Sequence, residues 1–85
     1  MFKTETLNAF ALVAKHRSFT LAAKAHGQTP MAMSKQVSQL EKRLPEPLFE
    51  RSTRNVSLTQ FGEEFLVRVH NILQKHDALE HWLES

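Results

Sequence analysis

Residues 29–54 constrain the fold of this chain most, because they read as an amphipathic helix followed directly by a basic hairpin. Thr29 is a good helix N-cap, and Pro30 suits the first helical position, where its missing N–H costs nothing. Apolar residues then recur at steps of four, three and four, which is typical of a helix that buries one side. They are Met33, Val37, Leu40 and Leu44. The sequence therefore predicts a helix over residues 30–44.

The opposite side of this predicted helix is short, polar and basic. It carries Met31, Ser34, Lys35, Ser38 and Lys42. Serine and lysine are small or extendable and bring hydrogen-bond donors, so such a face fits the major groove of DNA. A solvated helix face would show the same pattern, and these residues alone do not decide between the two interpretations.

The rest of the chain completes a recognisable arrangement. The predicted elements are helices over residues 4–15, 20–26 and 30–44, strands over 48–51 and 56–58, and a helix from residue 60 to near the end. Gly27 ends the second helix and leaves a tight turn before the third, while Pro45 and Pro47 stop the third. The predicted fold is mainly α: a winged helix-turn-helix domain over residues 1–59 with a short two-stranded wing, then a linker and dimerisation helix over residues 60–85.

The last helix, capped by Thr59, carries an apolar seam whose members are spaced four, three, four, three and four, as in a coiled coil. The seam consists of Phe65, Val69, Ile72, His76, Leu79 and Leu83, and Leu73 adds apolar surface beside it. A terminal helix that is apolar on more than one side needs more cover than its own small domain offers. We therefore expect a homodimer through this helix. His76 is the polar exception, which either sets the register or lies where the seam opens to water.

Charge is divided unevenly along the chain. Residues 1–59 hold nine Lys/Arg and four Glu, a net charge of +5, whereas residues 60–85 hold two Lys/Arg and five acidic residues, a net charge of −3. A basic front suggests contact with a polyanion, and double-stranded DNA is the expected partner. The N-terminus lacks the apolar run of a signal peptide and no segment is long enough to span a membrane, so a cytoplasmic protein without a membrane partner is expected.

Composition argues against other classes of function. The 85 residues allow one domain with a modest core, and the lack of Cys excludes disulfides and Cys-based zinc sites. The five His offer no pair three or four residues apart within a helix, so no metal site is predicted. With two Gly there is no phosphate-binding loop, and no nucleophile or metalloprotease motif occurs. Neither a cofactor nor an enzymatic activity is expected.

Arg51 and Arg54 lie three residues apart on the predicted hairpin. Such a pair can straddle a phosphate or reach a minor groove, adding salt-dependent affinity that is independent of sequence. Taken alone, a pair of this kind is more often simply solvated, so its assignment depends on the neighbouring helix-turn-helix.

These motifs together resemble the N-terminal winged helix-turn-helix of LysR-type transcriptional regulators. The resemblance rests on Ser18-Phe19-Thr20 with Ala22-Ala23, on Ala32, Ser34-Lys35-Gln36-Val37 and Leu40-Glu41, and on Leu48-Phe49, Arg51, Leu58-Thr59 and Gly62. The match runs from residue 7 to residue 62, and the long last helix is similar to the family's linker helix.

The resemblance implies a bacterial DNA-binding domain that dimerises through its linker helix. The DNA-binding residues that we predict are Thr20 at the start of the second helix, Thr29, Pro30, Met31, Ser34, Lys35 and Ser38 on the third helix, and Arg51, Thr53 and Arg54 in the wing. In such regulators a larger C-terminal domain senses a small molecule. We therefore expect this chain to be a fragment, with an effector bound only by that further domain and with higher oligomers open to the full-length protein.

Several positions depart from the pattern of the family. Pro30 stands where Gln is frequent, Arg17 replaces a common Gly, His26 stands where Leu is usual, and Pro45-Glu46 replace a common Gly-Val. The change at Pro30 removes an amide that can read a base, so the target preference is expected to differ.

A second hypothesis is a protein-interaction adaptor that uses the last helix, with the winged fold as a scaffold and no DNA binding. The charge of +5 over residues 1–59 discriminates between the two hypotheses, because an adaptor does not need it.

Overall fold

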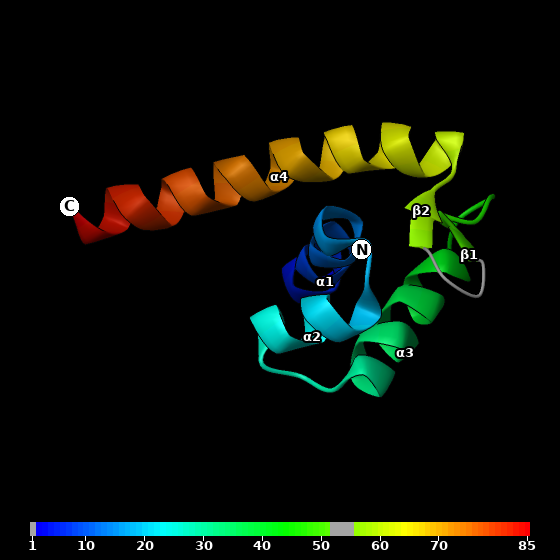
Figure 1. The fold of residues 1–85 in the computed structure, drawn as a ribbon. Helices are drawn as coiled ribbons and strands as arrows, with labels where there is room; N and C mark the ends of the chain where they lie inside the picture. Colours follow the sequence, from blue (N-terminus) through cyan, green and yellow to red (C-terminus); the bar gives the residue numbers. More distant parts are fainter. Residues whose placement is uncertain (1, 52–55) are drawn as a thin grey trace.

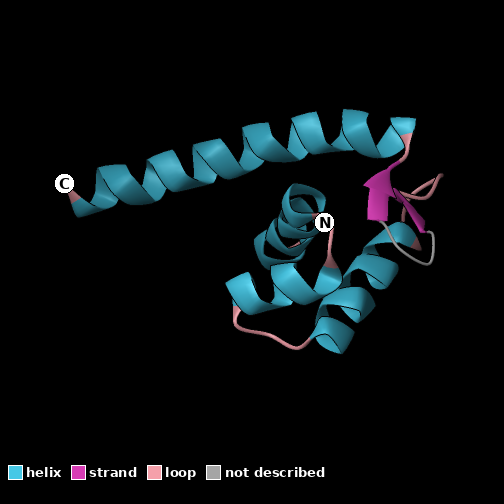
Figure 2. Cartoon of the chain, viewed as in Figure 1, coloured by secondary structure: helices cyan, strands magenta, loops and turns pink. Residues whose placement is uncertain are grey.

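The computed structural model describes residues 2–51 and 56–85. Its elements are α1 (Thr4–His16), α2 (Phe19–His26), α3 (Pro30–Glu41), β1 (Phe49–Arg51), β2 (Val56–Leu58) and α4 (Gln60–Glu84). The two strands pair antiparallel, with Phe49 opposite Leu58, and form the wing seen in Figure 2. The predicted fold class, a mainly helical winged helix-turn-helix with a long last helix, is confirmed (Figure 1).

Hydroxyl side chains fix the start of three helices. Ser18, Thr29 and Thr59 each accept a hydrogen bond from the backbone N–H three residues further on, at 2.9–3.1 Å. Each bond satisfies an N–H group that the first turn of a helix leaves without a partner. Because Ser18 is the cap, α2 begins at Phe19, one residue earlier than Thr20, where the sequence predicted it.

The third helix is three residues shorter than predicted, ending at Glu41 instead of Leu44. Beyond that point the chain makes tighter turns, in which Arg43 N donates to the Leu40 carbonyl at 3.0 Å and Leu44 N to the Glu41 carbonyl at 3.1 Å. A residue that precedes proline is disfavoured in the helical region. Pro45 therefore draws Leu44 and the turn before it out of the helix.

The core lies between α1, α2 and α3, with the first half of α4 against α1 (Figure 1). Phe10 is fully buried, and its ring centre lies 5.4 Å from that of Phe49 in the wing and 5.5 Å from that of Phe65 in α4. Aromatic pairs at such separations add about 0.5–1.5 kcal/mol to the gain from burial. One phenylalanine thus joins α1 to both the wing and the last helix.

The seam predicted on the last helix is divided between two environments. Val69 is 1% exposed and Phe65 is half-buried, and both pack into the chain's own core. Ile72, Leu79 and Leu83 are more than half exposed. The C-terminal part of α4 extends past the other helices (Figure 1). Val69 is buried in the core of its own chain, and its role in dimerisation stays a prediction. The predicted division between residues 59 and 60 coincides with the start of α4 and stays a prediction. The first half of α4 packs on the core.

The start of α4 is fixed on the segment that leads into the wing. A Cβ atom at Gly62 would collide with the carbonyl oxygen of Leu48, so only glycine permits this approach. Thr59 N donates to the same carbonyl at 2.9 Å, and the Thr59 hydroxyl donates to the Pro47 carbonyl at 2.7 Å.

Neither α4 nor any other helix among the described residues is both long and apolar enough to cross a membrane.

Candidate nucleic-acid interface

A left-handed residue, Gly27, joins α2 to α3. Its φ is +72°, and nothing lies within 4 Å of the position that a Cβ atom would take, so the backbone conformation and not the available space favours glycine. Gln28 N donates to the Ala23 carbonyl at 2.9 Å and closes the helix. The chain then enters α3 with one side against the core and the other toward solvent (Figure 1).

We call the solvent side of α3 and its cap the recognition face. It comprises Thr29, Pro30, Met31, Ser34, Lys35 and Ser38. Met31 is 82% exposed and Lys35 is exposed, whereas Ser34 and Ser38 are half-buried. Thr29 and Pro30 are exposed at the N-terminal end of the helix. The structure thus brings together on one accessible side the residues that the sequence predicted for α3.

Thr20, the predicted contact on α2, is exposed in the first turn of that helix. The first turn of a helix has free N–H groups and the positive end of the helix dipole. A hydroxyl at this place suits a phosphate oxygen, as predicted for Thr20.

Arg51 has partners within the chain. Its guanidinium donates to Oε1 of Glu41 at 3.1 Å and lies over the Phe19 ring, 5.1 Å from the ring centre. The side chain is 41% exposed. Arg51 therefore positions the wing, and its predicted contact with DNA has to compete with these two partners. Thr53 and Arg54, the other wing residues predicted to contact DNA, lie outside the described residues.

Glu41 is a residue whose role sequence reasoning missed. Its Oε2 accepts hydrogen bonds from Leu48 N at 2.8 Å and Phe49 N at 3.2 Å, while its Oε1 accepts from Arg51. One carboxylate at the end of α3 therefore holds both the backbone that enters β1 and a side chain at its end. The signal available in the sequence was a glutamate at the end of the amphipathic helix, seven residues before the first strand.

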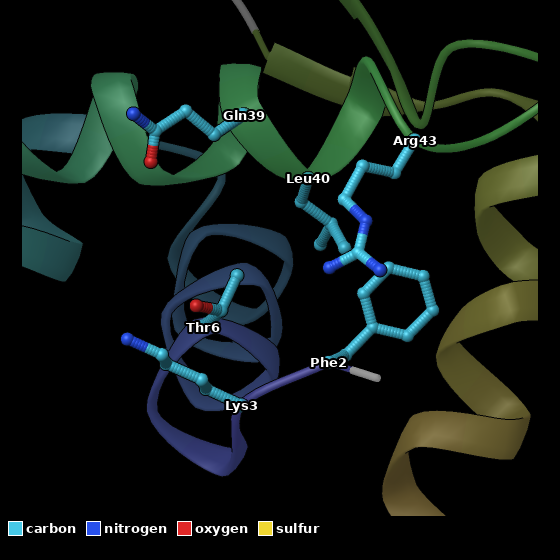
Figure 3. A pocket seen from close by; sticks show the side chains of 6 residues that line it. All are labelled: Phe2, Lys3, Thr6, Gln39, Leu40 and Arg43. Carbon is cyan, nitrogen blue, oxygen red and sulfur yellow. The ribbon is translucent and has the colours of Figure 1, made fainter.

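A hollow lies beside the recognition face, between the start of α1 and the end of α3 (Figure 3). Phe2 and Arg43 lie at the border of this hollow, and the guanidinium carbon of Arg43 is 4.8 Å from the centre of the Phe2 ring. The hollow has a volume of about 230 Å³, and its other lining residues are Lys3, Thr6, Gln39 and Leu40. Lys3 and Arg43 extend the positive charge around this end of α3.

Apolar surface is uncovered on α4 and next to it. The exposed apolar side chains of this helix are Val67, Ile72, Leu79, Trp82 and Leu83. A groove between α1 and α4 adjoins them and is lined mainly by Ala11, Leu12, Ala14, Leu66, His70 and Leu73. The predicted dimerisation residues thus lie in three places: Phe65 and Val69 in the core, Leu73 in the groove, and Ile72, His76, Leu79 and Leu83 on the exposed surface.

His76, the polar member of the seam, belongs to an exposed group on α4. Its Nδ1 lies 3.2 Å from a carboxylate oxygen of Glu80 and 3.8 Å from one of Asp77. The ligand-type atoms of the three residues lie within 4.8 Å of one another. The spacing of the histidines in the sequence does not indicate this group, because it combines one histidine with two carboxylates. Exposed pairs of this kind are common on helices, and no other observation indicates a metal here.

Comparison with known proteins identifies the family. Residues 4–63 match the model of the bacterial regulatory helix-turn-helix proteins of the lysR family. The chain belongs to the LysR family. It is 40% identical to the transcriptional regulator DgdR of Burkholderia cepacia over 73 residues, which are 86% of this chain and 25% of DgdR. It is 44% identical to the regulator BudR of Klebsiella aerogenes over 72 residues, which are 85% of this chain and 50% of BudR. The chain thus spans between a quarter and a half of the length of these relatives.

Solved structures of LysR domains share the fold. The DNA-binding domain of CbnR in complex with DNA is 28% identical, has a TM-score of 0.89 and aligns over 98% of this chain and 95% of its own. The BenM DNA-binding domain in complex with benA site 1 DNA is 28% identical, has a TM-score of 0.91 and aligns over 98% of this chain and 93% of its own. The predicted family and architecture are both confirmed.

Arg17 departs from the LysR pattern at a position whose backbone favours glycine. It ends α1 with a φ of +53°, and its N–H donates to the Val13 carbonyl at 2.8 Å. The left-handed region is unfavourable for a residue with a Cβ atom, so the backbone at this position favours glycine. His26, where leucine is usual, is half-buried at the end of α2, and Pro45 and Glu46 are exposed in the entry to the wing.

Proposed function

We propose that this chain is the sequence-specific DNA-binding domain of a LysR-type transcriptional regulator. It binds double-stranded DNA as a homodimer, with each recognition face in the major groove and each wing on the phosphate backbone or in the minor groove. The observation that carries this proposal is the exposed recognition face, on a backbone shared with the DNA-bound CbnR and BenM domains. The expected compartment is the cytoplasm, where a bacterial regulator meets DNA.

The distribution of charge favours DNA as the partner of this face. Residues 1–59 carry a net charge of +5, and Lys35 on α3 and Lys42 directly after α3 are both exposed. Positive side chains that neutralise phosphates release counterions and so gain affinity. Because Arg51 is held by Glu41, we assign the wing's direct contacts to Thr53 and Arg54 first and to Arg51 second.

The second copy of the chain packs on the uncovered part of α4. Ile72, Leu79 and Leu83 supply exposed apolar surface, and Leu73 lines the adjoining groove. Phe65 is half-buried, and the exposed part of its ring adds to this surface. His76 lies within this surface and is paired with Glu80. Two recognition faces held in one dimer require two related half-sites in the target. A small-molecule effector acts only through a further C-terminal domain of the full-length regulator, which can form higher oligomers.

The adaptor hypothesis draws support from the same exposed side of α4, where Trp82 is 70% exposed. It differs in predicting that the winged domain does not bind DNA. A direct binding experiment therefore separates the two functions.

The test is a titration of labelled DNA, selected from a random pool with this 85-residue chain, followed by fluorescence anisotropy at several salt concentrations. Lys35→Ala should weaken binding and lower the slope of log K against log salt by about 0.9, the value for one lost phosphate contact. Lys75→Ala removes the same charge from α4 and should leave the slope unchanged. Binding that is equally unaffected by both substitutions would contradict the recognition face, and failure to select any sequence would favour the adaptor.

A further inference from the structure

Met31 is the most exposed large apolar side chain among the described residues, at 82%. Five of the six others lie on α4, the helix through which the proposed dimer forms: Val67, Ile72, Leu79, Trp82 and Leu83. Met31 lies instead on the recognition face, next to the polar Ser34 and the charged Lys35. Neither the core nor the dimer accounts for an apolar side chain at this place.

The first turn of α3 presents apolar groups where the next turn presents donors. Pro30 is exposed and has neither a backbone N–H nor a polar side-chain atom. The Thr29 hydroxyl oxygen accepts a hydrogen bond from Ala32 N at 3.1 Å, which engages that N–H in capping the helix. Side-chain donors on this face of the helix begin one turn later, at Ser34 and Lys35. A base edge that meets the first turn is therefore read mainly by apolar contact.

The major groove offers one apolar group for such a contact. Adenine, guanine and cytosine present only donors and acceptors there, whereas thymine adds its C5-methyl group. We propose that Met31 is a specificity-determining residue that packs on the C5-methyl group of a thymine, with Pro30 beside it, so that the start of α3 selects thymine at one position of each half-site. This inference rests on the proposed function, because it assumes that the recognition face enters the groove.

Methionine is suited to this task by its shape. Its side chain is unbranched, flexible and polarizable, so it can adjust to a methyl group whose position varies with local DNA shape. Removal of one buried methyl group corresponds to a loss of about fourfold in affinity. The effect expected from a single thymine is therefore modest but measurable.

The experiment replaces single thymines by deoxyuridine, which removes the C5-methyl group and leaves the base pairing unchanged. A site selected from random DNA with the 85-residue chain is scanned at each thymine, and dissociation constants are measured by fluorescence anisotropy. For the unmodified protein, one thymine per half-site should lose about three- to fivefold in affinity when it becomes deoxyuridine. Met31→Ala should weaken binding to the thymine site and abolish the difference between thymine and deoxyuridine at that position.

Two control variants separate methyl recognition from general damage. Met31→Leu keeps an apolar side chain and should retain the preference for thymine, while Lys35→Ala should weaken binding to both DNAs by the same factor. If no deoxyuridine weakens binding, or if Met31→Ala keeps the sensitivity at the same position, the inference is overturned although DNA binding stands. If no DNA sequence is enriched in the selection, the proposed function itself fails, and this inference fails with it.

Discussion

Single residues of this domain adopt conformations that their side chains do not favour, and Arg17 is the clearest case. It closes α1 with a φ of +53°, a region in which a Cβ atom crowds the following carbonyl oxygen. The sequence signals the end of the helix near this point, but the left-handed conformation depends on how α2 must turn back onto α1. That turn follows from packing, so the cost at Arg17 is visible only in the structure.

We predict that Arg17→Gly stabilises the domain by about 0.5–1 kcal/mol, because relief of the left-handed conformation outweighs the extra freedom of glycine in the unfolded chain. Thermal unfolding at a fixed protein concentration should show a melting temperature higher by several degrees. Gly27→Ala is the matched control: it places a Cβ atom at a φ of +72° in open space and should lower the melting temperature by a similar amount. A melting temperature that does not rise in Arg17→Gly would contradict this account.

At the scale of elements, α3 and the wing are held together by the carboxylate of Glu41. The side chain is 17% exposed and accepts bonds from Leu48 N, Phe49 N and the Arg51 guanidinium. Hydrogen bonds in which one group is charged are about twice as strong as neutral ones. The position of the wing relative to α3 therefore depends on this one side chain.

We expect Glu41→Gln to destabilise the domain by about 2 kcal/mol, since it replaces a charged acceptor by a neutral amide whose NH₂ group faces Arg51. Urea unfolding followed by circular dichroism measures the change. Glu50→Gln, which neutralises an exposed carboxylate on β1, should change stability by less than about 0.5 kcal/mol. Combination of Glu41→Gln with Arg51→Ala should cost less than the sum of the two single changes, because both remove the same contact. Full additivity would show that Glu41 and Arg51 act independently.

The sequence predicts the elements well and their ends less well, for physical reasons. The caps at Thr29 and Thr59 depend on neighbouring residues, so local sequence is enough to place the start of each helix. The end of α3 depends on how many residues before Pro45 leave the helical conformation. The apolar spacing continues to Leu44, but the helix ends at Glu41. Glu41 accepts hydrogen bonds from Leu48 and Phe49, which lie seven and eight residues further along the chain. The spacing of apolar residues in the sequence does not indicate such contacts.

At the scale of the whole molecule, the apolar seam on α4 is divided between a buried part and an exposed part. Its first part, Phe65 and Val69, packs on the core of the same chain, whereas Ile72, Leu79 and Leu83 remain exposed. A heptad pattern predicts that one side of a helix is buried, but it does not indicate whether the same chain or another chain covers that side. The sequence therefore identified the apolar residues of α4 and could not tell which are buried within the chain and which remain exposed.

We predict that Ile72→Glu combined with Leu79→Glu converts a dimer of this domain into monomers, because two charges would be buried in the proposed interface. Both side chains are about half exposed in the single chain, at 52% and 54%, so the monomer should keep its helical circular dichroism. Sedimentation velocity measures the change in association. Gln74→Glu adds a charge on the side of the helix turned about 200° from Ile72 and should leave association intact. Equal behaviour of the two variants would exclude Ile72 and Leu79 from the interface.

The continuity of α4 has a consequence for how this domain can vary. The helix runs without interruption for 25 residues, from Gln60 to an exposed end at Glu84, and is about 37 Å long. One residue inserted between Val69 and Leu79 would rotate the outer half by about 100° relative to the core and carry its apolar side chains to another side. A point substitution does not change the rotation of the outer half of α4 relative to the core. A change in the length of α4 between core and tip should therefore disturb the proposed dimer more than a substitution away from the seam does.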